Sequence, residues 1–199
     1  MGAENTISDK ALVERARKGD EAAFDALVER HAARAYRVAY GILGNREDSE
    51  EVAQDVFVRI HRSLKEFRGD SEFTTWMYRI AVNLANNKYR WNKSRGERVK
   101  VSMDAPQEFE DGDAEQMELP DDAAGPAEAS VASERQQRLE RELARIPAVY
   151  RTPLLMYTVD DVNYEEIAAA LGCKVGTVKS RINRGRTMLR ERMDMQEKR

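Results

Sequence analysis

The clearest chemical pattern in the sequence lies near its C-terminus, in the run YEEIAAALGCKVGTVKSRINRGR that begins at Tyr164. Apolar residues recur with helical spacing on both sides of Gly172, a residue suited to the left-handed turn that ends a helix. In the second of these two expected helices, Val178 and Ile182 begin an inward stripe. The polar residues on the outward face and its flanks are Lys179, Ser180, Arg181, Asn183 and Arg184.

Side chains of these types recognise nucleic acids. Arg and Asn make paired hydrogen bonds to guanine and adenine edges, whereas Lys and Ser mainly fix the frame on phosphates. Asn163 and Glu166 have the spacing of a capping box at the start of the first helix. The run is therefore typical of a helix-turn-helix that reads a DNA groove, and the alternative is a helical hairpin with a solvated charged face.

A second chemical pattern closes the N-terminal half of the chain. From Asn83 to Arg95 the sequence mixes amides, cations and aromatic residues, among them Asn86, Asn87, Lys88 and Arg90. Such a mixture suits phosphates, base edges and the faces of unstacked bases. The alternative is a solvated helix end whose cations complement the helix dipole. Trp76, in contrast, falls on an apolar stripe and is expected in the core.

Helices must position both patterns, because no alternation of period two competes with the helical spacing. The N-terminal half predicts four helices: residues 9–18, a long helix between Asp20 and Gly44, one after Asn45, and one from about Ser71 to Tyr89. Inward positions include Phe24, Leu27 and Val28 on the second helix and a row on the third (Val52, Val56, Ile60 and Leu64). Two further helices around Pro147, with Leu139, Leu143, Ile146, Leu154, Leu155 and Tyr157 inside, complete a C-terminal bundle.

Charge divides the chain into three parts. The formal net charge is -3, but residues 101–134 hold eleven acidic side chains and no Lys or Arg, which leaves 33 basic against 25 acidic residues elsewhere. This acidic segment has few large apolar residues and is expected to be a flexible linker. The sequence therefore predicts an all-α protein of two small helical domains: residues 1–98, an acidic disordered linker over 99–134, and a helix-turn-helix domain over 135–199.

Several classes of protein are excluded by composition. The single Cys173 cannot form an internal disulfide, and His31 and His61 are too far apart to suggest a metal site, so no metal and no cofactor is expected. There is no glycine-rich phosphate loop or nucleophile motif, so an enzyme is disfavoured. No apolar run is long enough to span a membrane and no signal peptide is visible, so a cytoplasmic protein without membrane insertion is expected.

Four stretches in order resemble the extracytoplasmic-function sigma factors, most closely the envelope-stress branch. They are AFDALVERH, DSEEVAQDVFVRIHRSL, FRGDSEFTTWMYRIAVN and NYEEIAAALGCKVGTVKSRINRGR. The resemblance implies a sigma-two-like and a sigma-four-like domain. It also implies a protein that directs core RNA polymerase to promoters and starts DNA opening, with no covalent chemistry of its own.

The resemblance assigns roles to residues that match the family's motifs. Contacts to the clamp of the large polymerase subunit fall to Asp48, Glu51, Gln54 and Asp55. The residues expected to capture a flipped base in the minus-ten region are Arg59, Ser63, Phe67 and Asn83. Those expected to bind the adjoining strand are Asn86, Asn87, Lys88 and Arg90. The recognition-helix residues already named are expected to bind the minus-thirty-five element of promoter DNA. An anti-sigma factor is the further expected partner.

Two residues depart from the family's pattern. Asn183 stands where relatives often carry a bulkier residue, and Lys174 stands where many place a capping Ser or Asp. The alternative function is a helix-turn-helix regulator that binds an operator without being a polymerase subunit. It accounts less well for the amide- and cation-rich helix end of the N-terminal half.

Overall fold

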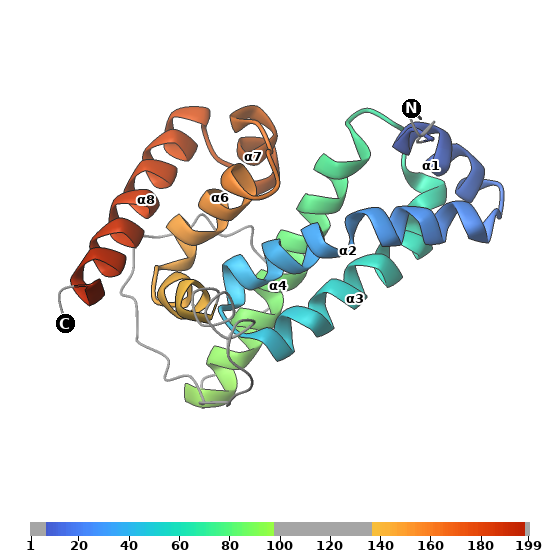
Figure 1. The fold of residues 1–199 in the computed structure, drawn as a ribbon. Helices are drawn as coiled ribbons and strands as arrows, with labels where there is room; N and C mark the ends of the chain where they lie inside the picture. Colours follow the sequence, from blue (N-terminus) through green and yellow to red (C-terminus); the bar gives the residue numbers. More distant parts are fainter. Residues whose placement is uncertain (1–6, 98–136, 198–199) are drawn as a thin grey trace, which may run out of the picture.

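The computed structural model describes residues 7–97 and 137–197, which form helices and no strand (Figure 1). The expected all-α class is confirmed for this part of the chain. The acidic segment predicted as a linker, residues 99–134, lies outside the described residues. In chain order the elements are α1 (Asp9–Arg17), α2 (Glu21–Leu43), α3 (Arg46–Ser63), η1 (Leu64–Glu66), α4 (Phe73–Glu97), a helical stretch over 137–144, α6 (Ala148–Thr158), α7 (Tyr164–Leu171) and α8 (Val175–Glu197).

Local capping explains where the first helices begin and end. The side chain of Asp20 accepts a hydrogen bond from the backbone N–H of Ala23, and that of Asn45 accepts one from Asp48, so each satisfies a free donor at a helix start. Gly44 ends α2 with φ 74°, a left-handed conformation that glycine adopts without a steric penalty. These three boundaries were predicted from the sequence and are confirmed.

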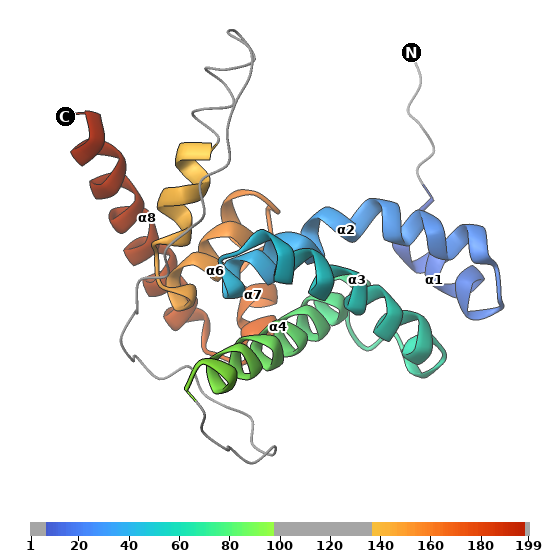
Figure 2. The same ribbon diagram turned by 90° about the horizontal axis from the view of Figure 1, so that it is seen from below.

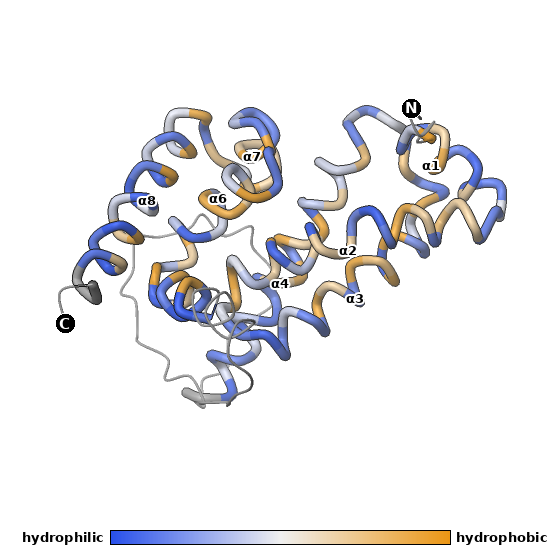
Figure 3. Tube along the Cα trace, in the orientation of Figure 1, coloured by the Kyte–Doolittle hydropathy of each residue, from blue (hydrophilic) through white to orange (hydrophobic). Residues whose placement is uncertain are grey.

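The first helical group, α1 to α4, packs around α2. Its core combines Leu27 and Val38 of α2, Val56 and Ile60 of α3 and Met77 of α4, all fully buried. Figure 3 shows apolar segments, in orange, along α2, α3 and α4. The predicted row on α3 is buried as expected, but Phe24 and Val28 of α2 are only half-buried.

The fourth helix is longer than predicted. The expected end at Tyr89 is wrong, because α4 runs on to Glu97. No proline interrupts this stretch, and the last turns are held against the start of α3: the side-chain amide of Asn92 donates a hydrogen bond to Asp48 at 2.8 Å. The amide- and cation-rich residues therefore stand on a continuous helix rather than on a loop.

The second helical group, α6 to α8, contains the predicted helix-turn-helix. Asn163 and Glu166 form the expected capping box, and Gly172 ends α7 with φ 66°. Ile167, Val178 and Ile182 are buried between the helices. One core assignment is wrong: Leu139 is 40% exposed, because the helical stretch 137–144 turns that side chain to solvent.

The two groups contact each other along α2 and α6 and along α4 and α7, and Figures 1 and 2 show them side by side. Gly41 of α2 lies against Thr152, and Arg37 pairs with the buried carboxylate of Asp160. Arg151 is 4% exposed and donates hydrogen bonds to the backbone carbonyls of Gly41 and Ile42 and to three carbonyls of residues 143–146. A buried cation thus caps the end of α2 from the second group.

Candidate nucleic-acid interface

The recognition-helix residues lie on one accessible face of α8. Lys179, Ser180, Asn183 and Arg184 are exposed, and Arg181 is half-buried beside them. The opposite side of the same turns is buried through Val178 and Ile182. These residues therefore lie on the outward face that the sequence predicted. Four hydrogen-bonding side chains face solvent on two successive turns, as reading a groove requires.

A pair of tyrosines beside this face was not predicted from the sequence. The rings of Tyr157 and Tyr164 stack with centroids 4.8 Å apart. The Lys179 ammonium lies 5.3 Å from the Tyr164 ring, and the Arg186 guanidinium lies 5.1 Å from the Tyr157 ring. These contacts hold two α8 cations, Lys179 and Arg186, against the tyrosine pair. The helical spacing of Tyr157 suggested core burial, which hid this role.

The base-capture residues expected from the family resemblance lie around η1 and α4. Phe67 and Trp76 stack with centroids 4.7 Å apart, and both are half-buried against Phe73. The expectation that Trp76 is core is therefore only partly met. Arg59 and Asn83 are exposed, and no hydrogen bond joins these two described residues. The hydroxyl of Ser63 donates to the carbonyl of Arg59 at 2.7 Å.

The end of α4 presents the four residues assigned to the adjoining strand. Asn87 and Arg90 are exposed and joined by a hydrogen bond of 2.6 Å, and Asn86 is half-buried. Lys88 differs, because its side chain is only 17% exposed and its ammonium is paired with two carboxylates. The hydrogen bond to Glu51 is the main cause that raises the pKa of Lys88.

Those two carboxylates belong to the face of α3 that the family resemblance assigned to polymerase. Glu51, Gln54 and Asp55 are exposed, as a contact surface requires. Asp48 is half-buried; burial alone would raise its pKa, but hydrogen bonds from Asn45, Asn92 and Lys88 lower it below the ordinary value. Asp48 therefore ties α3 to α4, a structural role that its position in the sequence did not reveal.

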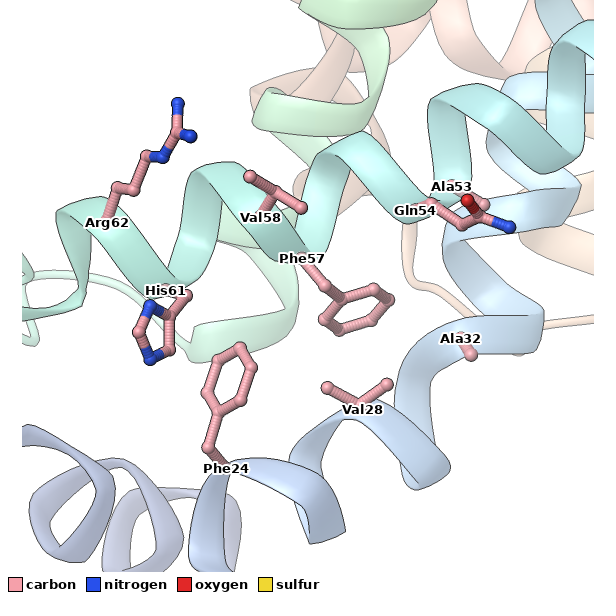
Figure 4. A pocket seen from close by; sticks show the side chains of 9 residues that line it. All are labelled: Phe24, Val28, Ala32, Ala53, Gln54, Phe57, Val58, His61 and Arg62. Carbon is pink, nitrogen blue, oxygen red and sulfur yellow. The ribbon is translucent and has the colours of Figure 1, made fainter. Parts of the chain in front are cut away.

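An apolar groove runs beside the same helix (Figure 4), between α2 and α3. Its volume is about 470 Å³, and Val58 within it is 47% exposed. Phe24 and His61 meet edge to face across it at 5.0 Å. The lining residues are Phe24, Val28, Ala32, Ala53, Gln54, Phe57, Val58, His61 and Arg62. The sequence analysis did not predict this groove. Val58 was the signal that could have indicated it, since it is an apolar residue on the polar face of α3.

Comparisons with known proteins match the same two helical groups. The model of Sigma-70 region 2 matches residues 27–95, and the model of Sigma-70, region 4 matches residues 136–189. The chain is 36% identical over 180 residues to the ECF RNA polymerase sigma-E factor of Escherichia coli (strain K12). This match covers 90% of this chain and 91% of that protein. It is 31% identical over 184 residues to the ECF RNA polymerase sigma factor SigW of Bacillus subtilis (strain 168), covering 92% and 96%.

Solved structures share the fold. CnrH, solved in complex with the cytosolic domain of CnrY, has a TM-score of 0.65 at 24% identity and covers 94% of this chain and 97% of that one. The sigma factor RpoE of Bartonella quintana, solved with the anti-sigma factor NepR, has a TM-score of 0.59 at 20% identity, covering 86% and 96%. None of the described helices is long and apolar enough to cross a membrane.

Proposed function

The chain belongs to the extracytoplasmic-function group of RNA polymerase sigma factors, and we propose that it acts on promoters through three surfaces on the helices described above. The observation that carries this proposal is that both helical groups expose a helix rich in amides and cations, one at the end of α4 and one on α8. A single DNA-reading module would need only one of them.

On α8, the exposed Asn183 and Arg184 are proposed to read base edges of the upstream promoter element. Lys179, Ser180 and Arg181 are proposed to hold the backbone, with Lys179 positioned by Tyr164 at 5.3 Å. In this arrangement the base-reading groups stand on a rigid helix whose other side is buried, which preserves their geometry.

On the first group, the surface around η1 and α4 is proposed to capture an unpaired base of the minus-ten region. The half-buried Phe67 supplies an apolar wall supported by Trp76, and Arg59, Ser63 and Asn83 supply polar groups at its edges. Extruding a base costs only a few kcal/mol, a cost that such contacts offset. Asn86, Asn87 and Arg90 would hold the adjoining strand.

Core polymerase is proposed to bind the exposed face of α3 at Glu51, Gln54 and Asp55. Gln54 also lines the apolar groove, so polar and apolar contacts adjoin on one side of the bundle. An interface of this kind, with an apolar centre and a charged rim, is usual between proteins. Docking of the polymerase clamp here is supported by the family resemblance, as is an anti-sigma factor that competes for the same surface.

Sigma factors are in general not enzymes, and we infer that this chain catalyses no covalent step. We infer a cytoplasmic location, where bacterial polymerase meets promoter DNA. The proposed domain limits are residues 1–98 for polymerase and minus-ten contacts, 99–134 for the linker and 135–199 for the upstream element.

The test is transcription by core polymerase on a pool of genomic fragments, with and without the purified chain. New start sites that appear only with the chain are expected. Asp55→Lys should weaken polymerase association, whereas the control Glu14→Lys, exposed on α1, should leave it unchanged. A wild-type chain that does not associate with polymerase contradicts the proposal and favours a regulator that acts alone on an operator.

A further inference from the structure

An exposed tryptophan stands on the last turns of α4. Trp91 is 49% exposed and its neighbour Tyr89 is 46% exposed, although both belong to the same rigid helix. Between Phe73 and Arg95, where burial is described, the last buried residue of this helix is Ala85, so the helix extends beyond the core at this point. Leaving large aromatic rings in water forgoes the stabilisation that burial would give, so packing does not account for Trp91.

Two cations lie against the Trp91 ring. The ammonium of Lys88 is 5.1 Å from the ring centroid and the guanidinium of Arg95 is 4.4 Å from it. Lys88 is held in place by Glu51 and Asp48, whereas Arg95 makes no ion pair with any described residue. A helix dipole explains cations at a helix C-terminus, but it does not explain an exposed aromatic ring between them.

We propose that Trp91 binds the exposed face of a DNA base, with Arg95 moving from the ring to an adjacent phosphate. An aromatic ring flanked by cations is the usual platform for an unstacked base, because every base has a flat face and every nucleotide carries a phosphate. The ligand is thus DNA that offers a base face: an unpaired strand, or the last base pair beside a melted segment.

This inference rests on the proposed function and extends its minus-ten surface. Trp91 follows Asn83 by eight residues of continuous helix, which places it about 12 Å further along the helix axis. A strand captured at Asn83 would therefore reach Trp91 within a few nucleotides. The base preference at this position would be weak, since stacking reads no hydrogen-bonding edge.

The experiment measures binding of the full chain, joined to core polymerase, to three labelled DNAs. They are an oligodeoxythymidine strand of about twelve nucleotides, a relaxed circular duplex that has no ends, and a linear fork of duplex with a single-stranded tail. Trp91→Ala should weaken binding to the strand, the fork or both by about ten-fold, and Trp91→Phe should restore most of it. Val159→Ala, an exposed apolar residue at the end of α6, is the control and should change nothing.

Salt dependence separates stacking from a merely structural role. Trp91→Ala should leave the slope of log affinity against log salt unchanged, whereas Arg95→Gln should reduce it by about 0.7 on the single strand.

The three DNAs distinguish the possible ligands of Trp91. If Trp91→Ala loses affinity for the strand, the ligand is an unpaired base; if it loses affinity for the fork alone, the ligand is the terminal base pair. The inference is overturned if Trp91→Ala and wild type bind the strand and the fork equally, or if Trp91→Ala loses as much affinity for the circular duplex. The proposed function fails separately, if wild-type chain starts no transcription.

Discussion

The ammonium of Lys88 lies 2.6 Å from a carboxylate oxygen of Glu51, so a residue assigned to DNA is paired with a residue assigned to polymerase. Asp48 lies 3.3 Å from the same ammonium. The start of α3 and the end of α4 therefore share one charge network. We therefore expect that a partner bound at Glu51 would change how strongly Lys88 attracts a phosphate.

Glu51→Gln tests this relationship. The variant should fold with a loss of less than about 1 kcal/mol, because Glu51 is 57% exposed and such pairs contribute little. Its Lys88 keeps only Asp48 as an ion-pair partner and so attracts phosphates more strongly. Non-specific duplex binding should therefore depend more steeply on salt, by up to about 0.9 in slope. Glu50→Gln is the matched control, since Glu50 pairs with Arg46 on the same helix. Equal slopes for the two variants would count against the coupling.

A second prediction concerns the contact between α2 and α6. A Cβ added at Gly41 would lie 3.0 Å from both the Cα and the Oγ1 of Thr152, whose side chain is buried. Gly41→Ala should lower the free energy of unfolding by about 1 to 3 kcal/mol, because the α6 backbone must shift. Gly176→Ala has open space around its Cβ and should raise stability by about 0.5 to 1 kcal/mol. Urea unfolding measures both, and a stabilising Gly41→Ala would show that the groups separate freely.

Local signals predicted much of this fold. The caps at Asp20 and Asn45, the capping box at Asn163 and the glycine at 172 act within four residues, so a sequence pattern contains all the information they need. The recognition-helix face followed from the same periodicity. Boundaries failed where the deciding contact was distant, as at the end of α4, where Asn92 meets Asp48.

Other features depend on partners far apart in the chain. Arg151 would be expected in water, yet it is buried against carbonyls of α2, which only the packed fold supplies. Loss of solvent lowers its pKa to about 10, a value at which it remains charged at neutral pH. Phe24 and Val28 fit an inward stripe, but they are only half-buried because they line the groove between α2 and α3. Helical periodicity predicts the side of the helix on which a side chain lies, but not which other element packs against it.

A third prediction is that stability falls as the pH is lowered. His31 is 1% exposed, and burial is the main cause that lowers its pKa below 6.5, although Asp9, 2.8 Å away, opposes the shift. The unfolded chain then binds a proton at a higher pH than the folded chain. The neutral His31 therefore contributes to the free energy of unfolding above pH 6.5. This contribution is lost as the pH falls below 6.5, by at most about 1.4 kcal/mol per pH unit.

Unfolding curves between pH 5 and 8 measure this effect. His31→Gln should flatten the pH dependence whatever its effect on absolute stability. The other histidine, His61, is exposed, so His61→Gln should keep the wild-type slope. An unchanged slope in His31→Gln would show that another group titrates.

A fourth prediction concerns the start of α8. Lys174 occupies the capping position, where its carbonyl accepts from Thr177 and Val178 but its ammonium cannot accept a hydrogen bond from the first turn. Lys174→Ser should raise the free energy of unfolding by about 1 kcal/mol, as a serine cap satisfies one free N–H. Lys174→Ala removes the same charge without a cap and should give no comparable gain. If both variants are equally stable, the cap is not what limits this helix.

The fifth prediction tests the recognition helix. Arg184 is exposed on α8 and paired with no described carboxylate, so its guanidinium is available for a guanine edge. In the holoenzyme, Arg184→Ala should cost about 1 to 3 kcal/mol on a cognate promoter and relax specificity at one upstream base pair. Arg190→Ala, exposed two turns later on the same helix, should weaken all sequences slightly and alike. Since both variants lose one positive charge, a difference between cognate and mismatched DNA in Arg184→Ala alone isolates base reading from phosphate attraction. The same ratio in wild type and Arg184→Ala would mean that another residue reads that base pair.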